Sequence, residues 1–352
     1  MADPRWIDEL ELARALPMEA AIEALEAALR DGLDPEEGPP REVVGVPAGQ
    51  LLLMPAAAGR YAGVKIASVA PGNAARGLPR IQGVYLLLDG DTLTPVALLP
   101  GADLTSLRTP AVSGVAVRRI TPDRPLSVVV FGAGPQAVRH IEAVAAVRTI
   151  SRIVAVLGRP GHPDRPDGPE RRDRPDGSER PGSGGPERPG GSVGGGGGGG
   201  DASAQTAAGR EARLATMEAV APPGVPVEAG DASAVADADL VVCCTSATEP
   251  IFPGHLLRDD AAVVAMGSHE PHAREVDDEA VARAALYVEA RSAALREAGD
   301  LILAGVTADR LINLAELMTA PVDLTRPRLF KSVGMPWEDL VTAAAAHDRA
   351  RT

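Results

Sequence analysis

Apolar residues in the middle of the chain form short continuous runs that are separated by helix-like patterns. The runs are residues 127–131, 152–157, 240–244 and 262–266. They are rich in Val, Ala and Leu with little polar alternation, which is typical of strands buried on both faces. Helical spacing is found at 136–147 and 209–220. These patterns predict an α/β fold with a parallel sheet covered by helices on both faces.

The first 120 residues show a different pattern. An amphipathic helix is predicted at 17–30, where Met18, Ala21, Ile22, Leu25 and Leu29 share one face. Shorter extended runs follow at 43–46, 50–55, 64–70 and 83–89, and the sequence Asp89-Gly90-Asp91 supplies a turn. This part is therefore predicted to be α+β with a mostly antiparallel sheet.

The first buried run leads directly into a glycine-rich turn. Phe131 is followed by Gly132-Ala133-Gly134-Pro135-Gln136-Ala137, and a helical pattern begins at once. In a Rossmann fold the first glycine permits the tight turn, the second lets the backbone approach a pyrophosphate, and the third small residue allows close helix packing. The N–H groups at the helix N-terminus then bind the phosphates. We therefore predict a dinucleotide site that includes Gly132, Ala133, Gly134, Pro135 and Gln136.

The end of the second run bears on which dinucleotide is preferred. A protein that binds NAD usually has Asp or Glu there, for the ribose hydroxyls. This chain has Leu157-Gly158-Arg159 instead. Arg159 is suited to a 2′-phosphate and favours NADP(H), with NAD(H) left open because Arg159 also begins a low-complexity segment.

That segment, residues 160–208, contains almost only Pro, Gly, Asp, Glu, Arg, Ser and Ala, with seven successive glycines at 194–200. It has little apolar surface to bury, so we expect a disordered insertion. The rest of 123–311 is predicted to be the Rossmann domain. Residues 1–122 are predicted to form the second domain together with 312–352, which we expect to be largely helical from 313 onward.

Composition excludes several function classes. The 352 residues carry a formal net charge of −13, which disfavours binding to nucleic acid or to anionic membranes. No uncharged apolar stretch reaches the length of about 18 residues that a membrane span needs, and the first residues do not resemble a signal peptide. The adjacent Cys243 and Cys244 are poorly placed for a disulfide. We therefore expect a cytoplasmic protein that acts on a small molecule.

Two lysines stand out among the basic residues. Of 35 Lys and Arg residues only Lys65 and Lys331 are lysine. Where arginine is the usual cation, a lysine is a candidate for a role that needs a compact ammonium, although chance retention explains it equally well.

Several separated motifs occur in one order along the chain. They are Gly77–Gly83, Leu104–Ser113, Gly132–Ala137, Gly267–Pro271, Ala293–Asp300 and Phe330–Gly334. This series resembles the ornithine cyclodeaminase and mu-crystallin family over nearly the whole chain except the insertion. The resemblance implies a homodimer in which an α+β domain binds the substrate and mediates dimerisation, while a Rossmann domain holds a nicotinamide cofactor. The active site is then expected between them.

The resemblance also implies roles for individual residues. Arg41, Lys65 and Arg108 match the family's cations that hold an amino-acid carboxylate. Two planar guanidinium groups and one ammonium are suited to binding and orienting such a carboxylate. Thr109, Thr245, Val333 and Gly334 are expected beside the cofactor. No metal is expected, since His269 and His272 lack further ligands nearby in the sequence.

Departures from the family pattern distinguish its activities. The cyclodeaminase branch has acids where this chain has Leu52 and His269, and commonly Thr where it has Arg80. The Gly267-Ser268-His269 pattern is more similar to the branch of ketimine reductases and cyclic imino acid reductases. The resemblance therefore implies hydride transfer from a reduced nicotinamide to the C=N bond of a small imino acid, with Lys65 or His269 supplying the proton. His269 has an alternative role as a cap of the turn after its strand.

Two other functions remain open at this point. One is a lyase that deaminates ornithine through bound NAD. The other is a binding protein similar to mu-crystallin that holds NADP and a small ligand without catalysis.

Overall fold

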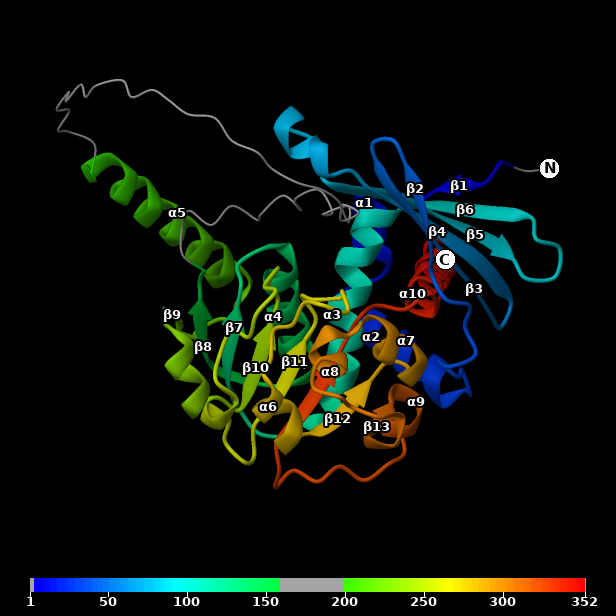
Figure 1. Cartoon of the computed structure of the whole chain (residues 1–352). Coiled ribbons are helices and arrows are strands. Elements are labelled where there is room, and N and C mark those ends of the chain that lie inside the picture. The colour runs from blue at the N-terminus through cyan, green and yellow to red at the C-terminus, as the bar shows by residue number, and fades with distance from the viewer. Residues whose placement is uncertain (1–2, 159–198, 352) are drawn as a thin grey trace, which may run out of the picture.

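The structure is a computed structural model that describes residues 3–158 and 199–351 (Figure 1). Within these residues the strands form a six-stranded sheet and an eight-stranded sheet. Figure 1 shows the six-stranded sheet beside one end of the eight-stranded one, with helix α3 (Gly101–Ile120) between them. The predicted α/β fold class, a Rossmann-like parallel sheet plus a separate α+β part, is confirmed.

The six-stranded sheet is mostly antiparallel, as the sequence predicts. Its order is β1 (Arg5–Trp6), β6 (Pro95–Pro100), β5 (Ile81–Asp89), β4 (Tyr61–Val69), β3 (Gly49–Ala58) and β2 (Glu42–Val46). Only the short β1 pairs in parallel, with β6, among the described strands of this sheet. Residue Lys65 of β4 lies opposite Met54 of β3 and Tyr85 of β5, so these three side chains share one face.

Helices cover that face of the sheet. They are α1 (Glu9–Ala15), α3 and α10 (Pro336–Arg349), while α2 (Met18–Arg30) packs on α3 and α10. The predicted apolar face of α2 is buried at Ala21, Ile22, Leu25 and Leu29. Helix α10 packs directly on β3, β4 and β5, and also contacts α2 and α3. Residues near the start of α10 therefore lie over Lys65.

The eight-stranded sheet is parallel throughout. Its order is β13 (Leu311–Asn313), β12 (Ala285–Val288), β14 (Arg328–Lys331), β11 (Ala262–Ala265), β10 (Leu240–Cys243), β7 (Leu126–Phe131), β8 (Ile150–Val156) and β9 (Val227–Ala229). The continuous apolar runs are buried as predicted, with Val128, Val129 and Val130 at most 1% exposed. The carboxyl ends of all these strands meet at one edge of the sheet.

The connections between these strands contain the remaining helices. They are α4 (Pro135–Val147), α5 (Gly199–Val220), α6 (Asp278–Arg283), α7 (Arg291–Glu297), α8 (Gly299–Ile302) and α9 (Leu314–Leu317), with short 3-10 turns η1 (Pro71–Arg76), η2 (Ala232–Asp237), η3 (Gly254–Leu256) and η4 (Ala308–Arg310). No helix in the described part of the chain is both long and apolar enough to span a bilayer.

Three expectations differ from the structure. Segment 313–352 is not largely helical, because β14 inserts between β11 and β12. The four residues of β14 begin with Arg328 and end with Lys331, so they contain no apolar run long enough to predict a buried strand. Only the α10 part of it packs on the first sheet. Residues 199–208 of the expected insertion belong to α5, and the rest of the insertion lies outside the described residues. Helix α3 and strand β6 were not predicted.

Candidate active site between the two sheets

The glycine-rich turn has the backbone that the sequence motif predicts. Gly132 follows β7 with a φ of +101°, a left-handed conformation that favours glycine. A Cβ atom at Gly132 would lie 2.4 Å from the carbonyl oxygen of Cys244, so a side chain has no room. A Cβ atom at Gly134 would meet no protein atom within 4 Å. The turn therefore packs tightly on one side and is open on the other.

The start of α4 fits a dinucleotide. Gly134 is the N-cap and makes no side-chain cap, and Pro135 is the first helical residue, so the N-terminal N–H groups face outward unpaired by a capping side chain. The side-chain oxygen of Gln136 is buried and has no partner among the described residues. This turn lies where the strand order reverses, between β7 and β10, which is the usual binding crevice of such sheets.

A second tight turn follows β14 at the same edge of the sheet. The buried carboxylate of Glu289 accepts hydrogen bonds from Ser332 Oγ (2.6 Å), Val333 N (2.8 Å) and Gly334 N (3.0 Å). Gly334 has a φ of +77°. A Cβ atom there would lie 2.5 Å from Nη1 of Arg108, so glycine lets this backbone approach the Arg108 guanidinium. The predicted residues Val333 and Gly334 are thus fixed beside a predicted substrate residue.

The three predicted cations converge on this turn. Arg41, which lies just before β2, donates from Nη2 to the carbonyl oxygens of Val333 and Gly334, and its Nε lies 3.0 Å from Oε2 of Glu297. Arg108 of α3 lies against Gly334. Lys65 of β4 is close enough to both arginines that their charges disfavour its ammonium form. Arg41 and Arg108, which are 67 positions apart in the sequence, therefore form one cluster with Lys65.

Two acids at the start of α10 accept hydrogen bonds from this cluster. Asp339 Oδ2 lies 2.7 Å from Lys65 Nζ, and its Oδ1 lies 3.3 Å from Arg108 Nε. Glu338 Oε2 accepts from Arg108 Nη1 at 2.9 Å. Both acids have no exposed surface. Sequence reasoning missed them because acids in the first turn of a helix are usually exposed and only complement the helix dipole.

Burial changes the protonation of these groups. It lowers the pKa of Lys65 to about 8, although the Asp339 carboxylate opposes the change. Burial, together with the charge of Glu289, raises the pKa of Glu338 well above its ordinary value. Lys65 is therefore a group that exchanges a proton near neutral pH, while Glu338 tends toward the neutral acid.

The arginines retain donors that a ligand can use. Among the described residues, Arg41 Nη1 and Arg108 Nη2 have no hydrogen-bond acceptor, whereas the three protons of Lys65 are used by Asp339 and Thr105 Oγ1. Free guanidinium N–H groups that converge from two elements are suited to a small carboxylate. The arrangement can therefore hold an anionic substrate beside Lys65.

His269 lies near this cluster without being fixed in it. Its side chain makes no hydrogen bond to the described residues, and the turn after β11 is closed by Ser268 Oγ, which donates to the carbonyl oxygen of Ala273 at 2.7 Å. Surrounding protein atoms and the positive charge of Arg41 lower the pKa of its imidazole. The capping alternative for His269 thus has no support in the structure, since Ser268 does that.

The other predicted residues have different surroundings. Thr245 follows β10, and both its N–H and its hydroxyl donate to Glu275 Oε1, at 2.8 and 2.7 Å. Thr109 is buried in α3 next to Arg108. Ala133 lies in the open turn between the two glycines. Arg159 lies outside the described residues, so its role in nucleotide preference stays a prediction.

A buried ionic network, also missed from the sequence, lies beneath the loops at this edge. Lys331 Nζ lies 3.0 Å from Asp300 Oδ2 and donates to the carbonyl oxygen of Ser268. Asp300 Oδ1 accepts from the N–H groups of Glu275 and Val276, and Glu275 holds Thr245 and Gly267. Lys331 therefore has a structural role in joining the loops after β10, β11 and β14.

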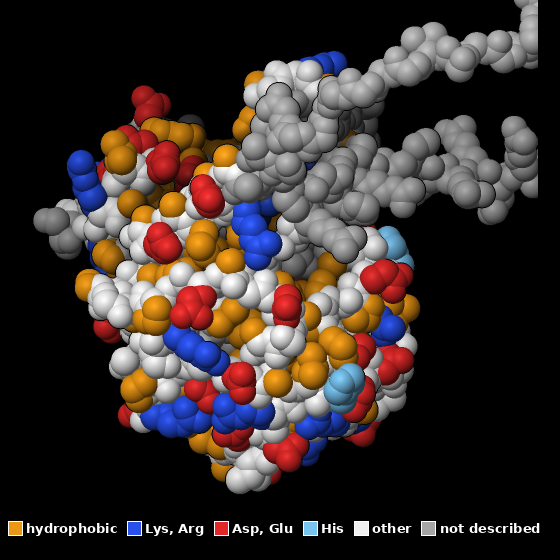
Figure 2. Space-filling view, turned by 90° about the vertical axis from the view of Figure 1, so that its left-hand side faces the viewer, with side chains coloured by type: hydrophobic (Ala, Val, Ile, Leu, Met, Phe, Trp, Pro, Cys, Tyr) orange, Lys and Arg blue, Asp and Glu red, His pale blue; other side chains and the backbone are white. Residues whose placement is uncertain are grey.

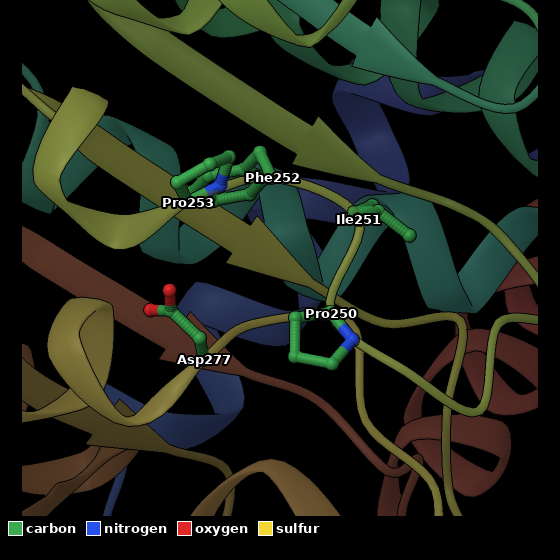
Figure 3. Close-up of a pocket in the computed structure, with 5 residues that line it drawn as sticks. All are labelled: Pro250, Ile251, Phe252, Pro253 and Asp277. Carbon is green, nitrogen blue, oxygen red and sulfur yellow. The ribbon is translucent and has the colours of Figure 1, made fainter.

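A separate shallow pocket is not part of this site. It has a volume of about 340 Å³ and is lined by Pro250, Ile251, Phe252, Pro253 and Asp277 (Figure 3). The Asp277 carboxylate is already used by the N–H groups of Gly254 and Ala280. On the face shown in Figure 2, acidic and basic side chains are interspersed.

Comparison with known proteins identifies the family of the chain. A sequence model of the ornithine cyclodeaminase/mu-crystallin family matches residues 8–160 and 205–352. The chain belongs to the ornithine cyclodeaminase/mu-crystallin family. The predicted family is thereby confirmed, and residues 161–204, which the family model leaves unmatched, fall within the expected insertion.

Similar members of the ornithine cyclodeaminase/mu-crystallin family are named as reductases. The Δ1-pyrroline-2-carboxylate/Δ1-piperideine-2-carboxylate reductase of Azospirillum brasilense is 31% identical over 97% of this chain and 94% of its own length. Mouse ketimine reductase mu-crystallin is 29% identical over 93% and 91%. The Thermococcus litoralis Δ1-pyrroline-2-carboxylate reductase, solved with NADH and L-proline, has the same fold, with a TM-score of 0.76, 24% identity and coverage of 99% and 97%. These relatives match the reductase branch that the sequence predicts.

Proposed function

We propose that the chain is an NAD(P)H-dependent reductase of a small cyclic imino acid, of the Δ1-pyrroline-2-carboxylate or Δ1-piperideine-2-carboxylate type. The observation that carries the proposal is the convergence of Arg41, Lys65 and Arg108 on the turn at Gly334, at the same sheet edge as the Gly132 turn. A carboxylate site and a dinucleotide site then adjoin. The similarity to reductases of this substrate class supports the same conclusion.

In the proposed reaction the residues of this chain bind, orient and protonate the substrate. The free N–H groups of Arg41 and Arg108 hold the substrate carboxylate. The turn at Gly132 and Gly134 and the N-terminus of α4 hold the pyrophosphate of the cofactor, which supplies hydride when bound. Lys65 provides a proton for the imine nitrogen, so that the C=N carbon becomes electrophilic. His269 is a second candidate for that proton.

The neighbours of Lys65 on β3 are apolar. Leu52 of β3 and Ala67 of β4 are paired, and they lie two residues from Met54 and Lys65 on the same face. None of these neighbours on β3 offers an acceptor for a second substrate amine. A lyase that binds the two amines of ornithine would need one there, which is why we favour the reductase over the lyase.

The proposal is tested by following NADPH and NADH absorbance with purified protein and each cyclic imino acid, with ammonia release from ornithine measured in parallel. Cofactor oxidation that depends on the imino acid is expected, with a lower KM for NADPH. Ammonia release without net cofactor change would establish the lyase instead. Nucleotide binding with no turnover of any of these substrates would favour the non-catalytic binding protein.

We also propose a homodimer that forms through the outer face of the six-stranded sheet. Helices pack on the face that carries Lys65. Val44 and Ile66 lie on the opposite face with Leu51 and Leu53. The side chains of Val44, Val46 and Ile66 are 38%, 36% and 37% exposed. Apolar side chains in such a row favour a partner surface of the same kind. Light scattering should give twice the mass of the chain, and Ile66→Asp should give a monomer; a monomeric wild type at micromolar concentration would refute this.

A further inference from the structure

Asp339 is a buried carboxylate that contacts both Lys65 and Arg108 of the candidate site. Its two oxygens lie 2.9 and 2.7 Å from Lys65 Nζ, and Oδ1 is also 3.3 Å from Arg108 Nε. The three residues come from three elements, α10, β4 and α3. One side chain therefore links a strand of the first sheet and the long helix between the sheets at the site.

The contacts of each cation make Asp339 the determining partner. Two of the three ammonium protons of Lys65 point to Asp339 and the third points to Thr105 Oγ1, at 3.2 Å. Arg108 is held on its other side by Glu338. A buried charge is costly unless it is paired and hydrogen-bonded, and Asp339 provides that pairing to both cations. Without Asp339, the Lys65 ammonium would keep one acceptor among the described residues, the neutral hydroxyl of Thr105.

The other groups that face Lys65 supply no negative charge. They are Arg108 and Thr105 from α3, Arg41 from the segment before β2, and Tyr85 from the adjacent β5. Both arginines disfavour an additional positive charge, and Tyr85 is buried with its hydroxyl unpartnered among the described residues. Of the groups in this set and Asp339, only Asp339 carries a negative charge.

We propose that Asp339 is a positioning residue of the reductase proposed above: it fixes the spacing of Lys65 and Arg108 and keeps Lys65 as the ammonium that protonates the imine nitrogen. The inference rests on the proposed function. In this step the imine carbon accepts hydride from NAD(P)H while the imine nitrogen accepts a proton from Lys65 Nζ. The products are the cyclic amino acid and NAD(P)⁺, and solvent returns the proton to Lys65.

The chain offers a direct measurement because it contains only two lysines, Lys65 and Lys331. Protein labelled with ¹³C-lysine should give two Cε signals by NMR, and the Lys65→Arg variant assigns them. In the wild type Lys65 should titrate near pH 8. Asp339→Asn should move that midpoint down by about 2 units. The matched variant Glu338→Gln changes a neighbouring acid whose side chain interacts with Arg108 and Glu289 and has no hydrogen bond to Lys65, so it should leave the midpoint in place. An unmoved Lys65 midpoint in Asp339→Asn overturns the inference.

Kinetics separate a positioning role from a structural one. The alkaline limb of kcat/KM for Δ1-piperideine-2-carboxylate should move down in pH together with the NMR midpoint, with NADPH affinity unchanged. A moved midpoint with an unmoved limb would also overturn the inference. If the wild type turns over no imino acid, the proposed function fails while the NMR titration still decides whether Asp339 holds the Lys65 charge.

A second variant covers the case in which Asp339→Asn does not fold. Asp339→Glu keeps the charge and displaces it by one methylene, so Lys65 should stay protonated to about pH 8 while kcat/KM falls about tenfold, because the cation spacing changes. Unchanged kcat/KM in a folded Asp339→Glu protein would show that the spacing is unimportant and would overturn the positioning role.

Discussion

The two glycines of the cofactor turn should separate stability from binding. At Gly132 the φ of +101° alone makes alanine unfavourable by about 2 kcal/mol, within the range for such strained conformations. The Cβ would also lie 2.4 Å from the backbone oxygen of Cys244, which cannot rotate away, so β7 or the residue after β10 must shift. We expect Gly132→Ala to lower the unfolding temperature by about 4–8 °C or more.

Gly134→Ala is the matched control, because it adds the same methyl group two residues away. Gly134 has a φ of −79°, and its Cβ would have no protein atom within 4 Å. Its effect on stability should be about 1 kcal/mol or less, as expected for an N-cap change from Gly to Ala. The methyl group would instead occupy the space through which a pyrophosphate approaches, so we expect the Kd for NADPH to rise at least about tenfold, or about 1.4 kcal/mol.

The assay combines thermal unfolding of both variants with titration of NADPH fluorescence. The reasoning about the turn is refuted if Gly132→Ala unfolds at the wild-type temperature. The placement of the pyrophosphate is refuted if Gly134→Ala is as stable as the wild type and binds NADPH equally well. A loss of binding in Gly132→Ala alone decides nothing about the pyrophosphate, because a displaced turn weakens binding indirectly.

The remaining predictions concern the substrate cations, nucleotide preference, pH and the insertion. Lys65→Met and Arg108→Leu should each abolish turnover while NADPH still binds, and retained activity in both would remove them from the site. Arg159→Ala should raise the KM for NADPH more than that for NADH; an unchanged ratio contradicts the assignment. Burial lowers the pKa of His140 to about 4 from an ordinary value of 6.5, so the unfolded chain binds more protons between these values, and stability should fall as the pH falls from 6.5 to 4. The loss is at most about 3 kcal/mol, and it should be absent in His140→Gln, as urea unfolding at pH 7 and pH 4.5 would show. Deleting residues 160–198 should leave the unfolding temperature unchanged within about 2 °C, since the sequence of that segment offers little apolar surface to bury; a folding failure would contradict this.

Local patterns predicted the elements that carry a strong periodic signal. The apolar runs at β7, β10 and β11 and the amphipathic face of α2 could be predicted without knowledge of distant contacts. Neighbouring residues alone show whether a strand is buried on both faces or a helix on one face. Helix α3 gave no such signal because it is buried nearly all round between two sheets, and its Pro110 is atypical of a helix interior. Strand β14 also gave no such signal, because it is only four residues long.

The candidate site was predicted only in part for a related reason. Motifs identified the cations Arg41, Lys65 and Arg108, but the acids that hold them come from elsewhere in the chain. Asp339 is 274 residues from Lys65, and nothing near either residue indicates the pairing. Which charges are neutralised depends on tertiary contacts, and that determines which donors remain for a substrate.

Strand β14 and helix α10 have a consequence for how the chain acquires its fold. Residues 328–331 complete the middle of the parallel sheet, and residues 336–349 cover the sheet of the first domain, so both halves need a segment that is synthesised after more than 300 others. Neither half can bury its core during translation until that segment leaves the ribosome. The nascent chain therefore has to keep two incomplete sheets from aggregating, and we expect it to depend on chaperones during synthesis more than a protein whose domains close one after the other.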